Sequence, residues 1–173
     1  MKAIWTIGHS TRPLEEFLLL LKTFGIELLV DVRHYPGSRK FPQFNKKNMA
    51  TTLPKNGFEY KHIIELGGRR KVAPNSKNDA WHLASFRGYA DYMETEVFKT
   101  ALKQLETLAN RKRTAIMCAE AVWWSCHRSM ISDALKVNGW NVFHIMNDKT
   151  ATEHPFTQPA NVIDGKLDYS KEK

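Results

Sequence analysis

The feature that constrains the fold most is the regular alternation of short strand-like segments with helical segments. Five segments have the apolar runs or the alternation typical of β-strands: residues 3–7, 28–32, 58–63, 114–118 and 141–146. Strands that alternate with helices form a mostly parallel sheet with helices on both faces. We therefore expect a single-domain, three-layer α/β protein with a Rossmann-like fold and about five strands.

The helical segments carry apolar residues at the period of an amphipathic helix. They are predicted at residues 13–25, 45–53, 92–110 and about 125–138. Ser125 is the expected N-cap of the last of these helices. An Asp-Gly pair within residues 162–167 predicts a short hairpin near the end of the chain.

The chain is long enough for one domain with its own core, and no linker or internal repeat divides it. We interpret residues 1–173 as one α/β domain with an insertion at about 36–71 and an extended tail from about 151. The longest apolar run, residues 17–21, is far too short to span a membrane. Because the N-terminus has no signal-peptide pattern, we expect a cytoplasmic protein with two reduced cysteines. The sequence does not decide between a monomer and a dimer.

Positive charge is concentrated in one part of the chain. From Arg33 to Lys71 there are ten Lys and Arg residues and two acidic ones, an excess of eight that equals the net charge of the whole chain. Aromatic residues lie among these cations: Tyr35, Phe41, Phe44, Phe58 and Tyr60. Because cations neutralise phosphates and rings stack on bases, the segment predicts a nucleic-acid partner. A solvated basic surface and a small phosphorylated ligand are the alternatives.

The segment with the most potentially reactive side chains is residues 118–128, which read Cys-Ala-Glu-Ala-Val-Trp-Trp-Ser-Cys-His-Arg. This segment follows a strand of the predicted sheet and precedes a helix, a position at which α/β proteins bind ligands. The candidate catalytic residues are Cys118, Glu120, Cys126, His127 and, after the first strand, His9.

Arg128 falls in the first turn of the predicted helix, where a cation is disfavoured unless an anion binds between it and the backbone amides. In the alternative interpretation, Arg128 pairs with a buried acid such as Glu120 or Asp31. We expect Asp31 to stay ionised and to hold an arginine. We also expect Arg33, Arg128 and Cys126 to line a single cavity that can hold negative charge.

The two cysteines allow different interpretations. A thiol beside cations at a helix N-terminus has a lowered pKa, so Cys126 is a candidate thiolate nucleophile, with core packing as the alternative. For Cys118 core packing is the favoured interpretation. Glu120 is a candidate proton donor or acceptor. We expect no metal and no cofactor, because adjacent Cys126 and His127 point in different directions and no Cys-x-x-Cys pair exists.

Five ordered motifs connect the chain to a known family: Thr6–Ser10, Val30–Pro36, Leu66–Gly68, Gly88–Met93, and Cys118–Glu120 with Cys126–Arg128. Together they resemble the family catalogued as domain of unknown function 488, and the likeness extends to Gly165–Tyr169 near the end of the chain. The resemblance implies a cytoplasmic, single-domain α/β protein. It supplies no established reaction.

The resemblance adds Gly67, Gly68, Tyr89 and Asp91 to the candidates. The two glycines precede Arg69 and form a flexible cationic loop that can close over phosphates, whereas Asp91 is favoured as a helix cap. The candidate ligand-binding or anion-binding residues are Ser10, Asp31, Arg33, Gly67, Gly68, Arg69, Tyr89 and Arg128.

These observations favour an enzyme that binds a phosphate-containing ligand, a nucleic acid or nucleotide, at the C-terminal edge of the sheet. One alternative is a non-catalytic module that binds nucleic acid or protein through the same face. A second alternative is an enzyme that acts on a small molecule with a Cys/Glu/His/Arg site.

Overall fold

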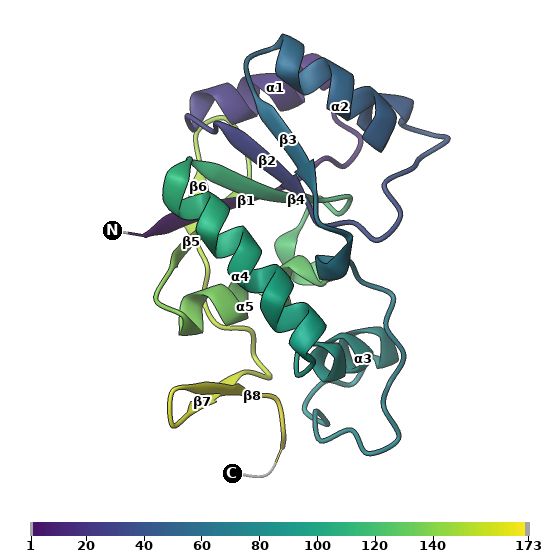
Figure 1. Cartoon of the computed structure of the whole chain (residues 1–173), viewed down its shortest axis with the longest axis vertical. Helices are drawn as coiled ribbons and strands as arrows, with labels where there is room; N and C mark the ends of the chain where they lie inside the picture. The colour runs from purple at the N-terminus through teal and green to yellow at the C-terminus, as the bar shows by residue number, and fades with distance from the viewer. Residues whose placement is uncertain (1, 172–173) are drawn as a thin grey trace.

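The computed structural model describes residues 2–171. A six-stranded sheet forms its centre, in the order β3-β2-β4-β1-β5-β6 (Figure 1). Its strands are β1 (Ala3–Gly8), β2 (Leu28–Asp31), β3 (Glu59–His62), β4 (Thr114–Cys118), β5 (Asn141–Ile145) and β6 (Ala151–Glu153). The first five are parallel, and β6 pairs antiparallel with β5. The predicted three-layer α/β fold with a mostly parallel sheet is confirmed, with one more strand than expected.

Helices cover both faces of the sheet. One face packs against α1 (Leu14–Thr23) and α2 (Lys46–Lys55). The opposite face packs against α3 (Ala84–Tyr92), α4 (Glu96–Arg111) and α5 (Arg128–Val137). Successive strand residues point to opposite faces, so each strand contributes to both layers of the core. In β4, Met117 packs with α1 and α2, whereas Cys118 packs with the other three helices.

Two predicted helices differ from the observed ones. The predicted helix at residues 92–110 is α4, which begins four residues later because Thr95 leaves the helical conformation and its side chain caps α4 by accepting a hydrogen bond from the Phe98 amide. The preceding helix, α3, was not predicted. The predicted helix from Ser125 begins at Arg128 instead. Ser125 belongs to a preceding single turn, η3 (Trp123–Ser125), and His127 occupies the N-cap position of α5.

The basic segment at 36–71 is largely part of the layered core. It contains η1 (Pro42–Phe44), α2, the edge strand β3 and η2 (Ile64–Leu66). The tail from 151 supplies β6 and then the hairpin of β7 (Asn161–Ile163) and β8 (Lys166–Asp168). The turn residues Asp164 and Gly165 both have positive φ, as the Asp-Gly signal predicts.

No helix within residues 2–171 is long and apolar enough to cross a membrane.

The segments that leave β1 and β4 stay hydrogen bonded beyond the sheet. The His9 amide donates to the Cys118 carbonyl at 3.0 Å, and the Ser10 amide donates to the Ala119 carbonyl at 2.9 Å. Gly8 permits this approach, because a Cβ added there would lie 1.7 Å from the carbonyl oxygen of Glu120. The absence of a side chain at Gly8 therefore fixes how closely the two loops pass at the C-terminal edge.

We predict that Gly8→Ala lowers the free energy of unfolding by about 3 kcal/mol or more, since the new methyl group meets backbone that cannot rotate away. Gly37→Ala is the matched control, because nothing lies within 4 Å of its added Cβ and its φ is not positive. The control should change stability by no more than about 0.5 kcal/mol. Urea unfolding of both variants measures the difference, and equal stabilities would contradict the close approach.

Candidate ligand-binding site

A pocket of about 390 Å³ opens at the C-terminal edge of the sheet, where β1, β2 and β4 end. Its walls include His9, Ser10, Arg33, Tyr35, Phe41 and Glu120. The chain leaves β1 and β2 toward α1 and α2 on one face, whereas it leaves β4 toward α5 on the other. Ligands of open α/β sheets bind where neighbouring connections diverge in this way, and the volume lies within the range of about 300–1,000 Å³ of small-molecule sites.

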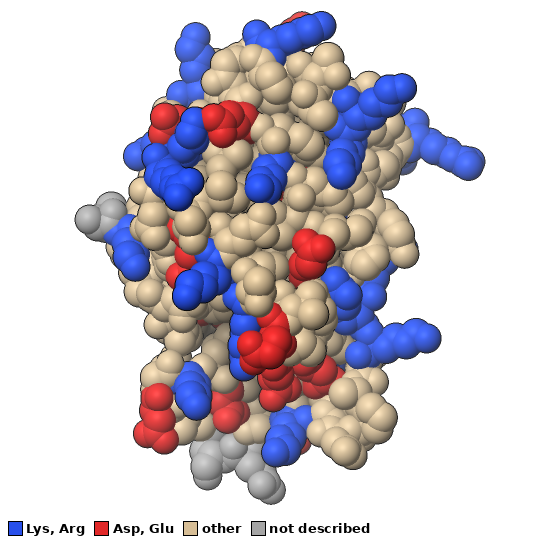
Figure 2. All heavy atoms as spheres, viewed as in Figure 1, with Lys and Arg blue, Asp and Glu red and all other residues tan. Residues whose placement is uncertain are grey.

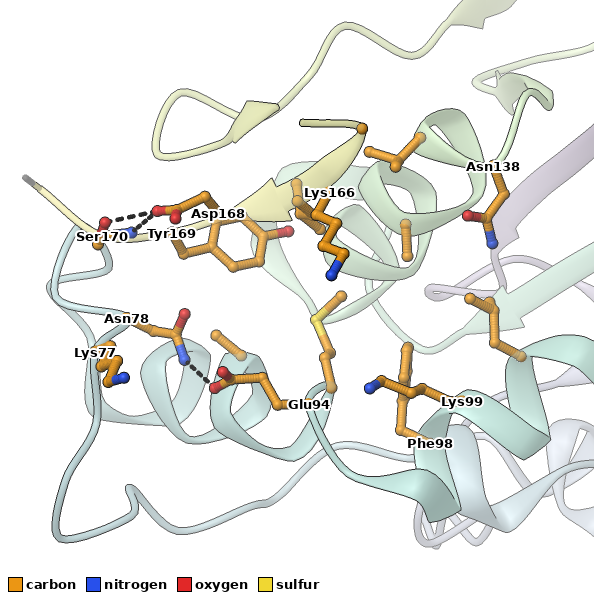
Figure 3. A pocket seen from close by; sticks show the side chains of 17 residues that line it. Lys77, Asn78, Glu94, Phe98, Lys99, Asn138, Lys166, Asp168, Tyr169 and Ser170 are labelled. Atoms are coloured by element: carbon orange, nitrogen blue, oxygen red, sulfur yellow. Dashed lines mark hydrogen bonds between the residues drawn. The ribbon is translucent and has the colours of Figure 1, made fainter. Parts of the chain in front are cut away.

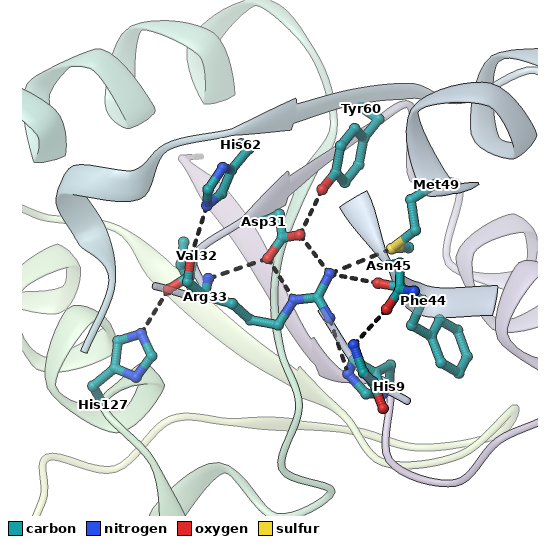
Figure 4. Close-up of polar contacts among 11 residues, drawn as sticks. His9, Asp31, Val32, Arg33, Phe44, Asn45, Met49, Tyr60, His62 and His127 are labelled. Atoms are coloured by element: carbon teal, nitrogen blue, oxygen red, sulfur yellow. Dashed lines mark hydrogen bonds and ion pairs between the residues drawn. The ribbon is translucent and has the colours of Figure 1, made fainter. Parts of the chain in front are cut away.

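An ion pair between Asp31 and Arg33 forms the base of this site (Figure 4). The Arg33 Nε donates to Oδ1 of Asp31 at 2.9 Å, and its Nη2 donates to Oδ2 at 2.7 Å. The same Nη2 donates to the Phe44 carbonyl, and the Tyr60 hydroxyl donates to Asp31 at 2.6 Å. Burial alone would lower the pKa of Arg33, but the hydrogen bonds and charge of Asp31 outweigh it and raise that pKa. Asp31 thus holds the guanidinium in place.

His9 lies between this ion pair and the pocket. Its Nδ1 donates to the Ser10 carbonyl at 2.9 Å, which leaves Nε2 to accept a hydrogen bond from Arg33 at 3.3 Å. The ring stacks on Phe44, with a centroid separation of 4.5 Å. Burial, together with the positive charge of Arg33, lowers the pKa of His9. His9 is therefore a neutral imidazole with both nitrogens engaged.

Glu120 differs from the other charged residues of the pocket because it is exposed. Within the described chain no hydrogen bond or ion pair engages its carboxylate. Only its backbone is held, by the Arg128 Nη2, which donates to the Glu120 carbonyl at 3.1 Å. The Glu120 side chain is thus free to accept a proton or a hydrogen bond from a bound molecule.

The predicted single cavity for Arg33, Arg128 and Cys126 is wrong. Arg33 packs against the α1 and α2 layer, where it contacts Phe44 and Met49. Arg128 is 1% exposed in the opposite layer and does not line the pocket. It supports the pocket wall indirectly, because Nη2 donates to the carbonyls of Glu120 and Ala121 in the loop after β4.

The two sulfur atoms lie together in the layer of Arg128. Cys118 Sγ and Cys126 Sγ are 2.8 Å apart, and both cysteines are free. Burial raises the pKa of Cys126 well above its ordinary value. Burial also acts on Cys118, but the Cys126 thiol and the Arg128 charge more than offset it and lower the Cys118 pKa. The thiolate predicted at Cys126 is therefore assigned to Cys118, because Cys126 precedes α5 instead of lying in its first turn.

His127 is also turned away from the pocket. Its Nε2 donates to the Val32 carbonyl at 2.8 Å (Figure 4), and burial, aided by the positive charge of Arg128, lowers the pKa of His127 to about 4. Its ring packs against Tyr89 at 5.1 Å between centroids. His127 joins α5 to the end of β2 as a neutral structural group.

The remaining predicted residues divide between the pocket and the scaffold. Ser10 lines the pocket. Arg69 is exposed, and its guanidinium lies 5.0 Å from the centroid of the Tyr35 ring at the pocket wall. Gly67 lets its loop pass the backbone of His34, since a Cβ there would lie 2.6 Å from the His34 Cα. Gly68 packs over the His127 ring.

Tyr89 and Asp91 are structural. The buried Tyr89 hydroxyl donates to the Leu66 carbonyl at 2.7 Å. Asp91 lies inside α3, and its carboxylate accepts hydrogen bonds from Ala73, Ser76 and Asn78. It therefore braces the irregular segment before α3 and does not cap α4.

A buried chain of hydrogen bonds connects Arg128 to Asp133. The Arg128 Nη1 donates to Thr6 Oγ1 at 3.2 Å, and the Thr6 hydroxyl lies 2.5 Å from Nδ1 of His144. The His144 Nε2 lies 2.8 Å from Nδ1 of His154, whose Nε2 lies 2.8 Å from Asp133. Because Arg128 can only donate and an ionised Asp133 can only accept, every bond of the chain points from the arginine toward the carboxylate.

The sequence analysis did not predict this chain of hydrogen bonds or part of the pocket. Hydrogen-bonded partners in the chain are up to 138 residues apart in the sequence, and a histidine in an apolar strand gives no local signal of such a partner. The sequence analysis also left Tyr35 out of the site, although this residue is 63% exposed and lines the pocket wall. An aromatic residue in a basic segment is the signal that indicates it.

Cationic side chains surround the pocket edge. Figure 2 shows Lys and Arg side chains projecting along the right-hand margin, the side of the loops after β2 and β3 in Figure 1, with few acidic side chains beside them. Arg39, Lys40 and Arg69 belong to these loops and are exposed. Part of the excess positive charge of the sequence, carried by Arg39, Lys40 and Arg69, therefore lies at the edge where the strands end.

A larger cavity of about 670 Å³ lies elsewhere, between the β7–β8 hairpin and α3, α4 and α5. Figure 3 shows Lys99 and Lys166 extending into it from opposite walls. Its floor is mainly apolar, with Met93, Phe98 and Leu102. We favour the smaller pocket because it joins strand ends, a buried ion pair and an unengaged carboxylate.

The family model described as Domain of unknown function DUF488 matches residues 13–135, which is most of the chain. The chain belongs to this family. No curated protein and no solved structure matches it. The part matched to DUF488 contains Arg33, Glu120 and both cysteines, whereas His9 and His144 lie outside it. Among residues 2–171, no group of three or more His, Cys, Asp or Glu side chains is arranged to hold a metal ion.

The buried histidines predict a loss of stability in mild acid. Burial, with positive charge nearby, lowers the pKa of His144 to about 2 and that of His127 to about 4. An unfolded chain protonates a histidine near pH 6.5, so below that pH the unfolded state binds protons that the folded state does not. Stability is therefore greatest above about pH 6.5 and falls by up to about 1.4 kcal/mol per pH unit for each histidine as the pH drops toward the folded pKa.

Urea unfolding between about pH 7.5 and about pH 5 measures this slope. His127→Asn should lower this slope by an amount that corresponds to up to one proton taken up on unfolding, whereas His82→Gln, at an exposed position, should leave the slope unchanged. A free energy of unfolding that stays constant across this range would contradict the neutral buried state of these rings.

Proposed function

We propose that the protein binds a phosphate-bearing ligand, a nucleotide unit of a single-stranded nucleic acid, in the pocket at the C-terminal edge of the sheet. One observation carries the proposal. The pocket combines an exposed aromatic residue and an unengaged carboxylate, and the exposed cations Arg39, Lys40 and Arg69 lie in the loops beside it. These are the ingredients of single-strand recognition.

Tyr35 supplies the stacking surface. Tyr35 is 63% exposed, and the Arg69 guanidinium lies 5.0 Å from the centroid of its ring, so a base that stacks on this ring also lies near a cation. Phe41 lines the same pocket and offers a second apolar contact. Stacking on such rings tolerates every base, because all bases have a π-face.

Exposed cations bind the phosphates. Arg39, Lys40 and Arg69 lie in the loops beside the pocket, and none forms an ion pair in the described part of the chain. Arg33 does not take this role directly, since Asp31 already neutralises it. Arg33 and Asp31 instead keep the pocket base rigid, which limits the entropy lost on binding.

Glu120 is the residue to which we assign proton transfer. His9 has both ring nitrogens engaged, and neither cysteine lines the pocket. Glu120 alone among the predicted acid–base residues has no partner and faces the pocket. The assigned chemistry is general acid–base catalysis on the bound nucleotide unit, in the cytoplasm.

The same observations favour a second candidate function, a binding module without catalysis. A pocket with a neutral His9 and no thiol contains no activated nucleophile. In that case Glu120 discriminates between ligands by accepting a hydrogen bond.

We predict that a fluorescently labelled oligothymidylate binds the protein and that Tyr35→Ala weakens binding by about five- to hundredfold, the worth of one stacked base. Arg69→Ala should also weaken binding, and it should reduce the slope of the logarithm of the binding constant against the logarithm of the salt concentration by about 0.7 in magnitude. Arg111→Ala is the matched control, because this exposed arginine ends α4 three residues before β4 begins, at the opposite edge of the sheet. Fluorescence anisotropy at two salt concentrations measures all three variants. Equal losses in Tyr35→Ala and Arg111→Ala, or no binding at low salt, would contradict the proposal.

Glu120→Gln separates the two candidate functions. We expect it to keep or slightly increase oligonucleotide affinity, since it removes a negative charge near the phosphates, and to abolish any product that the wild-type protein forms. Mass spectrometry of oligonucleotides after incubation detects such products. Product formation that survives in Glu120→Gln would overturn the role of Glu120, and a wild-type protein that binds but forms no product would establish the binding module.

A further inference from the structure

We propose that Cys118 and Cys126 form a redox-active pair that a hydroperoxide converts to an intramolecular disulfide, a modification beyond the proposed function. Cys118 ends β4, and Cys126 follows the η3 turn, so the two belong to opposite ends of one loop. Their sulfur atoms are 2.8 Å apart, in mutual contact. Disulfide formation therefore needs only a small movement of one side chain.

The buried charge of Arg128 is independent evidence that the Cys118–Cys126 pair carries a negative charge. Its guanidinium is 1% exposed, and no carboxylate within residues 2–171 forms an ion pair with it. Its hydrogen bonds run to the Thr6 hydroxyl and to two carbonyls, which carry no charge, and its Nε has no partner. A buried cation without an anion is costly.

The thiolate of the cysteine pair supplies that anion. The Arg128 backbone amide donates to Cys126 Sγ at 3.3 Å, and the charge of Arg128 acts on both sulfurs. Although burial opposes ionisation, the Cys126 thiol and Arg128 together lower the pKa of Cys118. A thiolate is the form of cysteine that reacts with peroxides.

The reaction balances with hydrogen peroxide as the oxidant. The Cys118 thiolate attacks one peroxide oxygen, an S–O bond forms as the O–O bond breaks, and hydroxide leaves. The Cys126 thiol, whose sulfur is 2.8 Å away, then attacks the Cys118 sulfenic acid, an S–S bond forms, and the thiol proton leaves with the hydroxyl as water. Two electrons pass from the sulfurs to the peroxide.

Disulfide formation changes the surroundings of the pocket. It closes the loop that carries Glu120 and the adjacent Trp123 and Trp124, and it removes the thiolate beside Arg128. Arg128 holds the Glu120 and Ala121 carbonyls, so oxidation acts on the pocket wall through this residue. An effect of oxidation on ligand affinity rests on the proposed function, whereas the disulfide itself does not.

Treatment of the folded wild-type protein with hydrogen peroxide tests the proposal. We expect the intact mass to fall by two hydrogen atoms, both thiols to disappear from titration in denaturant, and dithiothreitol to restore them. The folded protein should react at least about tenfold faster than the same chain unfolded in urea, where the sulfurs are separated. Cys126→Ser should instead gain oxygen atoms on Cys118 or stay unchanged, with no loss of two hydrogens.

A wild-type protein that gains oxygen atoms, keeps both thiols, or forms the disulfide no faster than the unfolded chain would overturn the proposal. The decisive comparison uses only wild-type protein, so a Cys126→Ser variant that fails to fold does not affect it. Oligothymidylate binding, measured separately on the reduced and oxidised forms, keeps the two proposals distinct. If the disulfide forms but neither form binds the oligonucleotide, the proposed function fails and the redox pair stands.

Discussion

The buried guanidinium of Arg128 is the interaction on which the C-terminal edge of the sheet depends. It joins Thr6 of β1 to the carbonyls of Glu120 and Ala121 in the loop after β4, and it does so from the first residue of α5. Through Thr6 it also orders the histidine chain that ends at Asp133. A buried charge that loses its partners is strongly destabilising, so the loop that forms one wall of the pocket is held in a single arrangement.

The polar and charged residues at the C-terminal edge of the sheet have two separate roles. Arg33 and Arg128 form internal hydrogen bonds and build the scaffold. Tyr35, Glu120 and Arg69 are exposed and face outward. The separation follows from physical chemistry, because a buried ion needs fixed partners and then has little capacity left for a ligand. We accordingly assign ligand recognition to the exposed residues and pocket rigidity to the buried ones.

Sequence patterns predicted the sheet and its edge but not the orientation of the side chains at that edge. The strands at 3–7, 28–32 and 114–118 were predicted to within one residue, because apolar runs bounded by turns are local signals. The face of the sheet to which a side chain points depends on the register between strands, and these strands lie far apart in the sequence. Asp31 is the register partner of Met117, so Asp31 and Cys118 lie on opposite faces of the sheet. Arg33 stays with Asp31 and Cys126 stays with Cys118, so the expected common cavity does not form. The start of α4 was predicted four residues too early because Met93 continues the apolar period of this helix, and α3 was not predicted.

Assignment of amide shifts during a titration with a thymidine dinucleotide tests the central claim, that the ligand occupies the pocket where β1, β2 and β4 end. The account predicts that two-dimensional NMR spectra of the ¹⁵N-labelled protein change at residues 9–11, 35–38 and 119–121, with one common saturation curve. Changes confined to residues 165–170, which line the larger cavity beside the β7–β8 hairpin, would contradict it, as would unchanged spectra at about millimolar ligand.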